Sequence, residues 1–267
     1  PLAQWMTDPD NPYFARAITN RIWANFFGRG LVEPVDDLRL SNPASNEALL
    51  AATSEHLIHV GFDLRRLMRT ILQSETYQRD SLPLPENAEE FKYFSRYYPR
   101  RLMAEVLLDC IDQTLQTHTR FDRIAFIGSD VQKTTLYPVG TRAIELYDAA
   151  IESYFLKTFG RNPREITCDC ERSDEPSMVQ VLHMSNGTTI NEKVTSQDGL
   201  LARCLEQSVA PEVVLRDLFE RAICRSPEPD ELDVLLQTMA EYGDDERTAL
   251  GDVAWSILTS TEFTFNH

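Results

Sequence analysis

The sequence contains no apolar run that approaches the roughly 20 residues of a membrane-spanning helix, so we expect none of it to cross a bilayer. Nothing at its beginning has the pattern of a secretory signal peptide. The first residue is Pro1 rather than methionine, which indicates a piece of a longer polypeptide. The missing signal peptide therefore leaves the cellular compartment open.

Several catalytic motifs are missing too. There is no glycine-rich phosphate loop, no G-x-S-x-G elbow and no H-E-x-x-H zinc motif. The absence of C-x-x-C-H excludes covalent haem attachment within this chain. Acidic pairs occur at residues 36–37, 89–90 and 244–245, and we interpret them as loop and helix-start residues. A glycosidase stays an alternative, because its two carboxylates need not be close in sequence.

Basic residues are scarce relative to acidic ones. Lysine and arginine total 26 against 42 aspartates and glutamates, and the formal net charge is -16. Such an excess of carboxylates repels phosphate backbones, so we expect no nucleic acid partner, whereas basic partners or cations are favoured. With 42% hydrophobic residues, a chain of 267 residues is long enough to bury a substantial core.

The commonest pattern in the sequence is apolar residues at helical spacing. Asp63 is a candidate N-cap for a helix that begins at Leu64, and the helix before it ends at Gly61. Further helices are predicted to begin at Pro99, Pro211, Ser226–Pro227 and Asp244 or Asp245. The sequence therefore predicts a mainly α fold, a multi-helix orthogonal or bundle-like domain with a loop-rich centre and one or two short strands.

We expect a single domain over residues 1–267, without internal repeats. Its N-terminal part, 1–118, and its C-terminal part, 198–267, are predicted to be helical. The segment 119–197 between them lacks clean periodicity and is predicted to be irregular. Short connections predict that the last three helices are antiparallel neighbours.

The stretch NPYFARAITNRIWANFFGRG, residues 11–30, predicts a helix that is apolar almost all round and ends at Gly28. On a helical wheel Arg21 and Asn25 fall within its most apolar side. An arginine in such a place keeps its charge and needs acceptors for its five donors. Carboxylates elsewhere in the sequence are the acceptors that would also neutralise its charge.

A second predicted helix carries Glu105 and Asp109 one turn apart, with Arg101 one turn before them. We predict a buried or half-buried charge network that joins Arg21 and Arg101 to these two carboxylates. One interpretation is that the network orients two helices and does no chemistry. The other is a cleft whose paired charges hold a polar ligand such as a sugar or a carboxylate.

The pair Cys168 and Cys170 has three interpretations. It could bind a metal with His183 as third ligand and Cys204 or Cys224 as fourth, although the spacing matches no standard zinc pattern. One member could form a disulfide with a distant cysteine in an exported protein. Otherwise both are unpaired packing residues, and His183 is a satisfied core histidine near the apolar face of a helix.

Five stretches resemble one protein family. They are NPYFARAITNRIWANFFGRGLVEPVDDLRLSNPAS, LRRLMRTILQSETYQRDS, RRLMAEVLLDCI, CDCERSDEPSMVQVLHMSNG and the closing WSILTSTEFTFNH. In this order they are similar to the C-terminal domain of unknown function, number fifteen fifty-three, of the large cytochrome-associated proteins of Planctomycetes (the PSD type). The resemblance covers nearly the whole chain.

The resemblance implies an exported, for instance periplasmic, multidomain protein. A haem-bearing cytochrome-type module and a second uncharacterised domain are expected to precede this part, so haem is expected there and no cofactor here apart from the metal alternative. The family supplies no catalytic residues. Residues that match its motifs are Asn20, Arg21, Trp23, Phe27, Gly28, Arg29, Gly30, Arg100, Arg101, Glu105, Asp109, Cys168, Cys170, Arg172 and Asn186.

Three functions remain open. The favoured one is a binding module that docks the haem-bearing part of the same polypeptide, a secreted partner protein or a surface polysaccharide. The second is a carbohydrate-active enzyme domain, oxidative if the haem module supplies electrons. The third is a domain whose Cys-x-Cys loop binds a metal or contacts haem.

Overall fold

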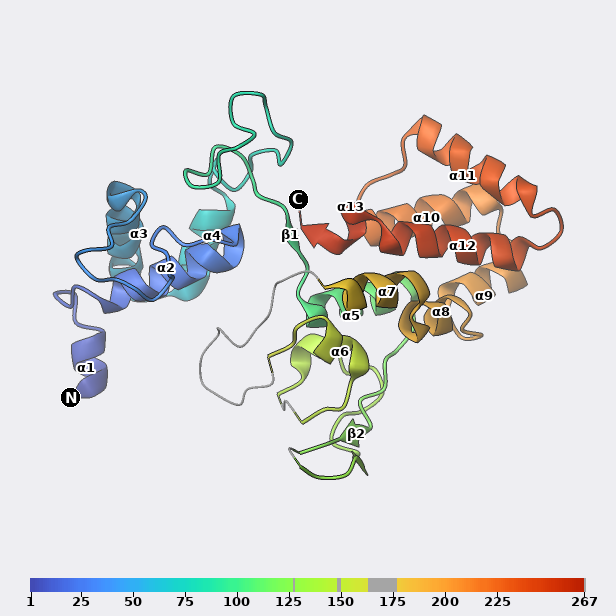
Figure 1. Ribbon diagram of the computed structural model, residues 1–267, viewed down its shortest axis with the longest axis horizontal. Helices are drawn as coiled ribbons and strands as arrows, with labels where there is room; N and C mark the ends of the chain where they lie inside the picture. The colour runs from blue at the N-terminus through green and yellow to red at the C-terminus, as the bar shows by residue number, and fades with distance from the viewer. Residues whose placement is uncertain (127, 148–149, 163–176, 267) are drawn as a thin grey trace. The chain divides into compact units, whose positions relative to one another are not determined.

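The computed structural model describes residues 1–126, 128–147, 150–162 and 177–266 (Figure 1). Its contacts divide the chain into two compact units, Pro1–Arg100 and Arg101–Asn266. The helix that was expected to close an N-terminal part at residue 118 therefore belongs to the second unit. The reason is packing, because this helix lies at the centre of the second unit's core.

Helices account for most of the regular structure, which confirms the predicted mainly α class. The first unit holds α1 (Leu2–Met6), α2 (Phe14–Phe27), α3 (Glu47–His59) and α4 (Leu64–Leu72). The second unit holds α5 (Ala104–Leu115), the 3-10 helix η1 (Ala143–Glu145), α6 (Tyr154–Thr158), α7 (Met178–Asn186), α8 (Thr188–Val194), α9 (Leu200–Glu206), α10 (Pro211–Ile223), α11 (Pro229–Glu241), α12 (Glu246–Thr259) and α13 (Thr261–Thr264).

The strands of the described residues are two residues long each. They are β1 (Arg100–Arg101), β2 (Arg123–Ile124), β3 (Gln132–Lys133) and β4 (Phe265–Asn266). β1 pairs with β4, and β2 pairs with β3 in an antiparallel register. These short pairs agree with the expectation that strands contribute little to this fold.

Three predicted helix starts are confirmed because each depends on a local side-chain signal. The carboxylate of Asp63 accepts the backbone N–H of Arg66 at 3.1 Å and caps α4. Asp245 caps α12 in the same way, and Pro211 occupies the first turn of α10.

Two predicted starts are wrong by several residues. The helix expected from Pro99 begins at Ala104, because the residues between are extended and form β1. The helix expected from Ser226 begins at Pro229, where Glu228 and Glu231 form a capping box. The Ser226 hydroxyl instead donates to a carboxylate oxygen of the preceding helix.

The core of the first unit is rich in aromatic rings carried by α2. Trp23 stacks on Phe27 with 4.2 Å between ring centroids, and the Phe27 ring also contacts Tyr77, Phe94 and Tyr97. Leucines of α3 and α4 complete this core. The apolar character of residues 14–27 is thus explained by packing on more than one side of the helix.

Asn20 holds the loop that follows α2. Its side chain is fully buried, and its amide group donates to the carbonyls of Val32 at 3.0 Å and Val35 at 2.7 Å. Its amide oxygen accepts the N–H of Val32 at 3.0 Å. Gly28 ends α2 with a positive φ of 74°, and a Cβ there would meet the Arg100 side chain at 2.3 Å. These two motif residues are therefore architectural.

The second unit is built around α5. Its side chains Leu107, Leu108, Ile111 and Leu115 are buried, and η1, α6, α8, α9 and α10 pack against it. α10, α11 and α12 pack on one another, as the orange and red helices of Figure 1 show. This arrangement agrees with the expectation that the last three helices are neighbours.

Replacement of Asn20 by alanine is expected to lower the free energy of unfolding by about 2–4 kcal/mol, because it removes three hydrogen bonds and leaves buried backbone groups without partners. The matched control is Asn25→Ala on the same helix, whose side chain is exposed and whose loss is expected to cost under about 0.5 kcal/mol. Urea unfolding followed by tryptophan fluorescence measures both. Equal effects of the two variants would contradict the role given to Asn20.

Candidate functional site

Arg21 lies at the surface of the first unit, so its predicted burial is wrong. Its side chain is 56% exposed, and its Nε and terminal nitrogen donate to the two carboxylate oxygens of Asp36 at 2.7 and 2.8 Å. This hydrogen bond lowers the pKa of Asp36. The physical reason is the loop held by Asn20, which folds back and brings the carboxylate to the arginine. Asn25 is also exposed, and its backbone carbonyl accepts a hydrogen bond from Arg100.

A buried guanidinium–carboxylate pair does exist, but in the second unit. Glu105 of α5 lies 3.6 Å from the guanidinium of Arg161, and the two side chains are 11% and 6% exposed. The sequence pattern missed Arg161 because it lies in an irregular segment after α6. Since Arg21 belongs to the first unit, the predicted network between it and Glu105 stays a prediction.

Arg101 lies at the start of the second unit. Its guanidinium donates to the side-chain oxygen of Gln180 and lies over the ring of Phe159, 5.9 Å from the ring centroid. Asp109, one turn after Glu105 on α5, has a separate role. It accepts the N–H groups of Ala143 and Ile144 at 2.6 and 3.1 Å and so holds the first turn of η1.

The helix α7 has two polar side chains buried and four apolar side chains exposed. Gln180 and His183 are 6% and 8% exposed. The exposed apolar residues of the same helix are Met178 at 72%, Val179 at 51%, Val181 at 54% and Leu182 at 57%. At 100° per residue these four lie on the side of the helix opposite Gln180, together with the exposed Ser185 and Asn186 of its last turn. A surface helix ordinarily has the reverse arrangement.

The buried polar side chains of α7 are satisfied by specific partners. The amide nitrogen of Gln180 donates to the carbonyl of Thr158 at 3.0 Å, and its oxygen accepts the N–H of Ser177 at 3.1 Å in a capping box. The same oxygen accepts the hydrogen bond from Arg101. These contacts determine which side of α7 faces inward, because a buried amide without partners would cost free energy.

His183 is the second inward residue of α7. Its Nε2 lies 3.0 Å from the Thr189 hydroxyl, and its ring contacts those of Tyr154, Phe155 and Phe159. Burial lowers its pKa below the ordinary value of 6.5. It therefore fits the interpretation as a satisfied core histidine.

The predicted metal site stays untested, because Cys168 and Cys170 lie outside the described residues. Among the residues that the structure describes, no three His, Cys, Asp or Glu side chains gather as a metal site requires. Cys204 and Cys224, the candidates for a fourth ligand, are free thiols.

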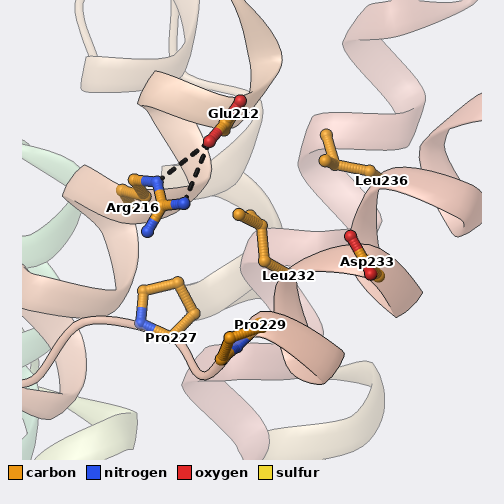
Figure 2. Close-up of a pocket in the computed structure, with 7 residues that line it drawn as sticks. All are labelled: Glu212, Arg216, Pro227, Pro229, Leu232, Asp233 and Leu236. Carbon is orange, nitrogen blue, oxygen red and sulfur yellow. Dashed lines mark hydrogen bonds and ion pairs between the residues drawn. The ribbon is translucent and has the colours of Figure 1, made fainter.

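A small pocket of about 250 Å³ lies between α10 and α11 (Figure 2). Figure 2 shows Glu212 and Arg216 joined on the α10 wall, with Leu232, Asp233 and Leu236 contributed by α11. The guanidinium donates to one Glu212 oxygen through two nitrogens, at 2.9 and 3.2 Å. The two charges of this wall thus satisfy each other, which leaves little demand for a charged ligand.

Comparison with known families matches residues 1–239 to the family PSD1, described as a protein of unknown function (DUF1553). The chain belongs to this family. No curated protein and no solved structure matches it. Membership confirms the resemblance carried by the sequence motifs and assigns no reaction. In the described part of the chain, no helix is long and apolar enough to cross a membrane.

The Glu105–Arg161 pair is expected to couple strongly in a double-mutant cycle. Glu105→Gln or Arg161→Met alone should each lower the free energy of unfolding by about 3–5 kcal/mol, because each removes a charged partner from a buried ionised side chain. The double variant should cost at least about 1 kcal/mol less than the sum of the two. The control cycle on the exposed pair Glu212 and Arg216 should give a coupling under about 0.5 kcal/mol. If the effects of Glu105→Gln and Arg161→Met on the free energy of unfolding were additive, the two side chains would not interact, and the pair as described would be contradicted.

Stability is expected to fall as the pH drops below about 6.5, the ordinary pKa of histidine, because the unfolded imidazole takes a proton before the buried ring of His183 does. His183→Gln should flatten this part of the melting temperature profile, whereas His118→Gln, at an exposed position, should leave it unchanged. NMR titration gives the ring pKa directly. A value above 6.5 for His183 would refute the account.

Proposed function

We propose that the chain is a non-catalytic interaction module of a larger exported polypeptide, and that the outward face of α7 docks on the haem-bearing part of that polypeptide. The observation that carries the proposal is the reversed polarity of α7. Four aliphatic side chains point to solvent on a helix without a charged residue, in a chain whose net charge is -16. Such a contiguous apolar surface is typical of a protein contact.

The chemistry of this face favours a protein partner over a polysaccharide. Its apolar side chains are Met178, Val179, Val181 and Leu182, and it offers no aromatic ring on which a sugar could stack. An uncharged aliphatic face is complementary to an apolar groove, in which helices dock through residues spaced at i, i+3 and i+4.

The size of the face supports a partner within the same polypeptide. A helix of nine residues is about 14 Å long, and the area it covers is well below the roughly 800 Å² per partner of a stable interface between free proteins. A tethered partner needs less area, because a linker raises its effective concentration to the millimolar range. Haem and the exported location are inferred from the family resemblance and belong to this proposal.

The ionisable groups singled out by the sequence support a binding role over an enzymatic one. Asp109 holds η1, Glu105 pairs with Arg161, and His183 contacts Thr189 and three aromatic rings. Each is engaged in holding the fold. The carbohydrate-active alternative has no comparable observation in its favour.

The test uses the full-length polypeptide and hydrogen exchange of the α7 amides. Leu182→Glu is expected to raise their exchange rate at least tenfold by displacing the partner, without lowering the melting temperature, since Leu182 is 57% exposed. The matched control is Val213→Glu, an aliphatic residue of α10 that is 56% exposed.

A photo-crosslinking phenylalanine analogue at position 182 identifies what α7 touches. The expected crosslink joins α7 to the haem-bearing module, and the same analogue at position 213 should give none. A crosslink to a second copy of the chain, or no crosslink together with unchanged exchange, would overturn the proposal.

A further inference from the structure

An open groove of about 490 Å³ is lined by residues of α10, α11 and α12, and its α11 residues lie on the side of that helix opposite those of the pocket in Figure 2. Its apolar lining comes from Phe219, Ile223, Val234, Leu235 and Ile257. Ser256 and Ser260 also line it, together with the acidic residues described next. Val234 is 60% exposed, so the groove offers aliphatic surface to solvent. This volume is in the range of sites that bury a ligand's apolar groups.

One end of the groove is acidic. Arg225 lies between Glu231 and Glu262 and donates to both carboxylates at 2.7 to 2.8 Å, while its guanidinium lies over the Phe219 ring. Asp230 also lines the groove and has no ion-pair partner among the described residues. Two carboxylates share the Arg225 guanidinium and Asp230 adds a third, which leaves this part of the groove with a net negative charge.

Glu231 keeps its charge at neutral pH. The hydrogen bond from Arg225 lowers the pKa of Glu231 to about 2, and the same contacts raise the pKa of Arg225. Protonation therefore does not break this ion pair under ordinary conditions. An occupant of the groove has to meet an apolar floor and a negative end at once.

We propose that this groove binds an amphipathic helix of a partner protein, whose aliphatic side chains fill the groove and whose lysine or arginine meets the acidic end beside Asp230. Charge complementarity supports this occupant, because a chain of net charge -16 attracts basic partners. The apolar lining of the groove fits the way helices dock in grooves. The proposal concerns a different surface from α7 and does not depend on the function proposed above.

A second copy of the chain is a poorer occupant. A symmetric contact would place the same patch, with its excess of carboxylates, on both subunits. Two surfaces of the same sign lack the charge complementarity that a basic partner supplies. The basic amphipathic helix has no such conflict.

The test measures binding of a fluorescent synthetic peptide to the full chain by fluorescence anisotropy at 150 mM NaCl. The peptide has leucine at helical spacing and lysine elsewhere, and a second peptide carries glutamate in place of every lysine. The lysine peptide is expected to bind at least tenfold more tightly than the glutamate peptide.

Two variants of the groove separate its apolar and electrostatic parts. Val234→Gln should weaken binding of the lysine peptide at least fivefold. Val234→Ile, which keeps an apolar side chain at this position, should bind the peptide as the unmodified chain does. Asp230→Asn should weaken it at least threefold. The matched controls are Val213→Gln on α10 and Asp233→Asn on the opposite face of α11, both expected to stay within twofold.

Three results would overturn the proposal. Equal effects of Asp230→Asn and Asp233→Asn would show attraction by the overall charge alone. An unchanged affinity in Val234→Gln would place the peptide elsewhere. Absence of peptide binding, together with a dimer in light scattering that Val234→Gln dissociates, would assign the groove to a second copy of the chain.

Discussion

The surface of the second unit depends on the burial of Gln180. An amide removed from water must keep hydrogen-bond partners, and this one finds them in Arg101, Ser177 and the carbonyl of Thr158. Because these partners surround one side of α7, the helix can present only its other side to solvent. That side carries the aliphatic residues from which we infer a docking surface. The function proposed here is thus a consequence of hydrogen bonding inside the unit.

Arginine placement follows the same logic in both units. A guanidinium cannot lose its proton, so its donors need acceptors wherever it lies. Arg21 finds a carboxylate at the surface in Asp36, and Arg161 finds a buried one in Glu105. Arg225 is an intermediate case, since Glu231 and Glu262 share it beside a groove. Each of these three arginines thus has at least one carboxylate partner in a strongly acidic chain.

Local signals allowed part of the fold to be predicted. Asp63, Asp245 and Pro211 mark helix starts because capping and the geometry of proline involve only a few neighbouring residues. The start of α5 was not predictable in this way, because residues 100–101 are held in β1 by a strand from the other end of the sequence. The candidate site was predicted only in part: Arg101, Glu105 and His183 were singled out, whereas Arg161 and Gln180 were missed.

By itself, the sequence determined the mainly α class, the family and the requirement that a buried arginine have hydrogen-bond acceptors, because these follow from residue spacing, motif order and the fixed charge of the guanidinium. Only the tertiary structure decided which arginine is buried and which side of α7 faces solvent. Burial depends on the residues that surround a side chain in space. Gln180 meets Arg101 across 79 positions of the chain, and no local pattern specifies such a contact.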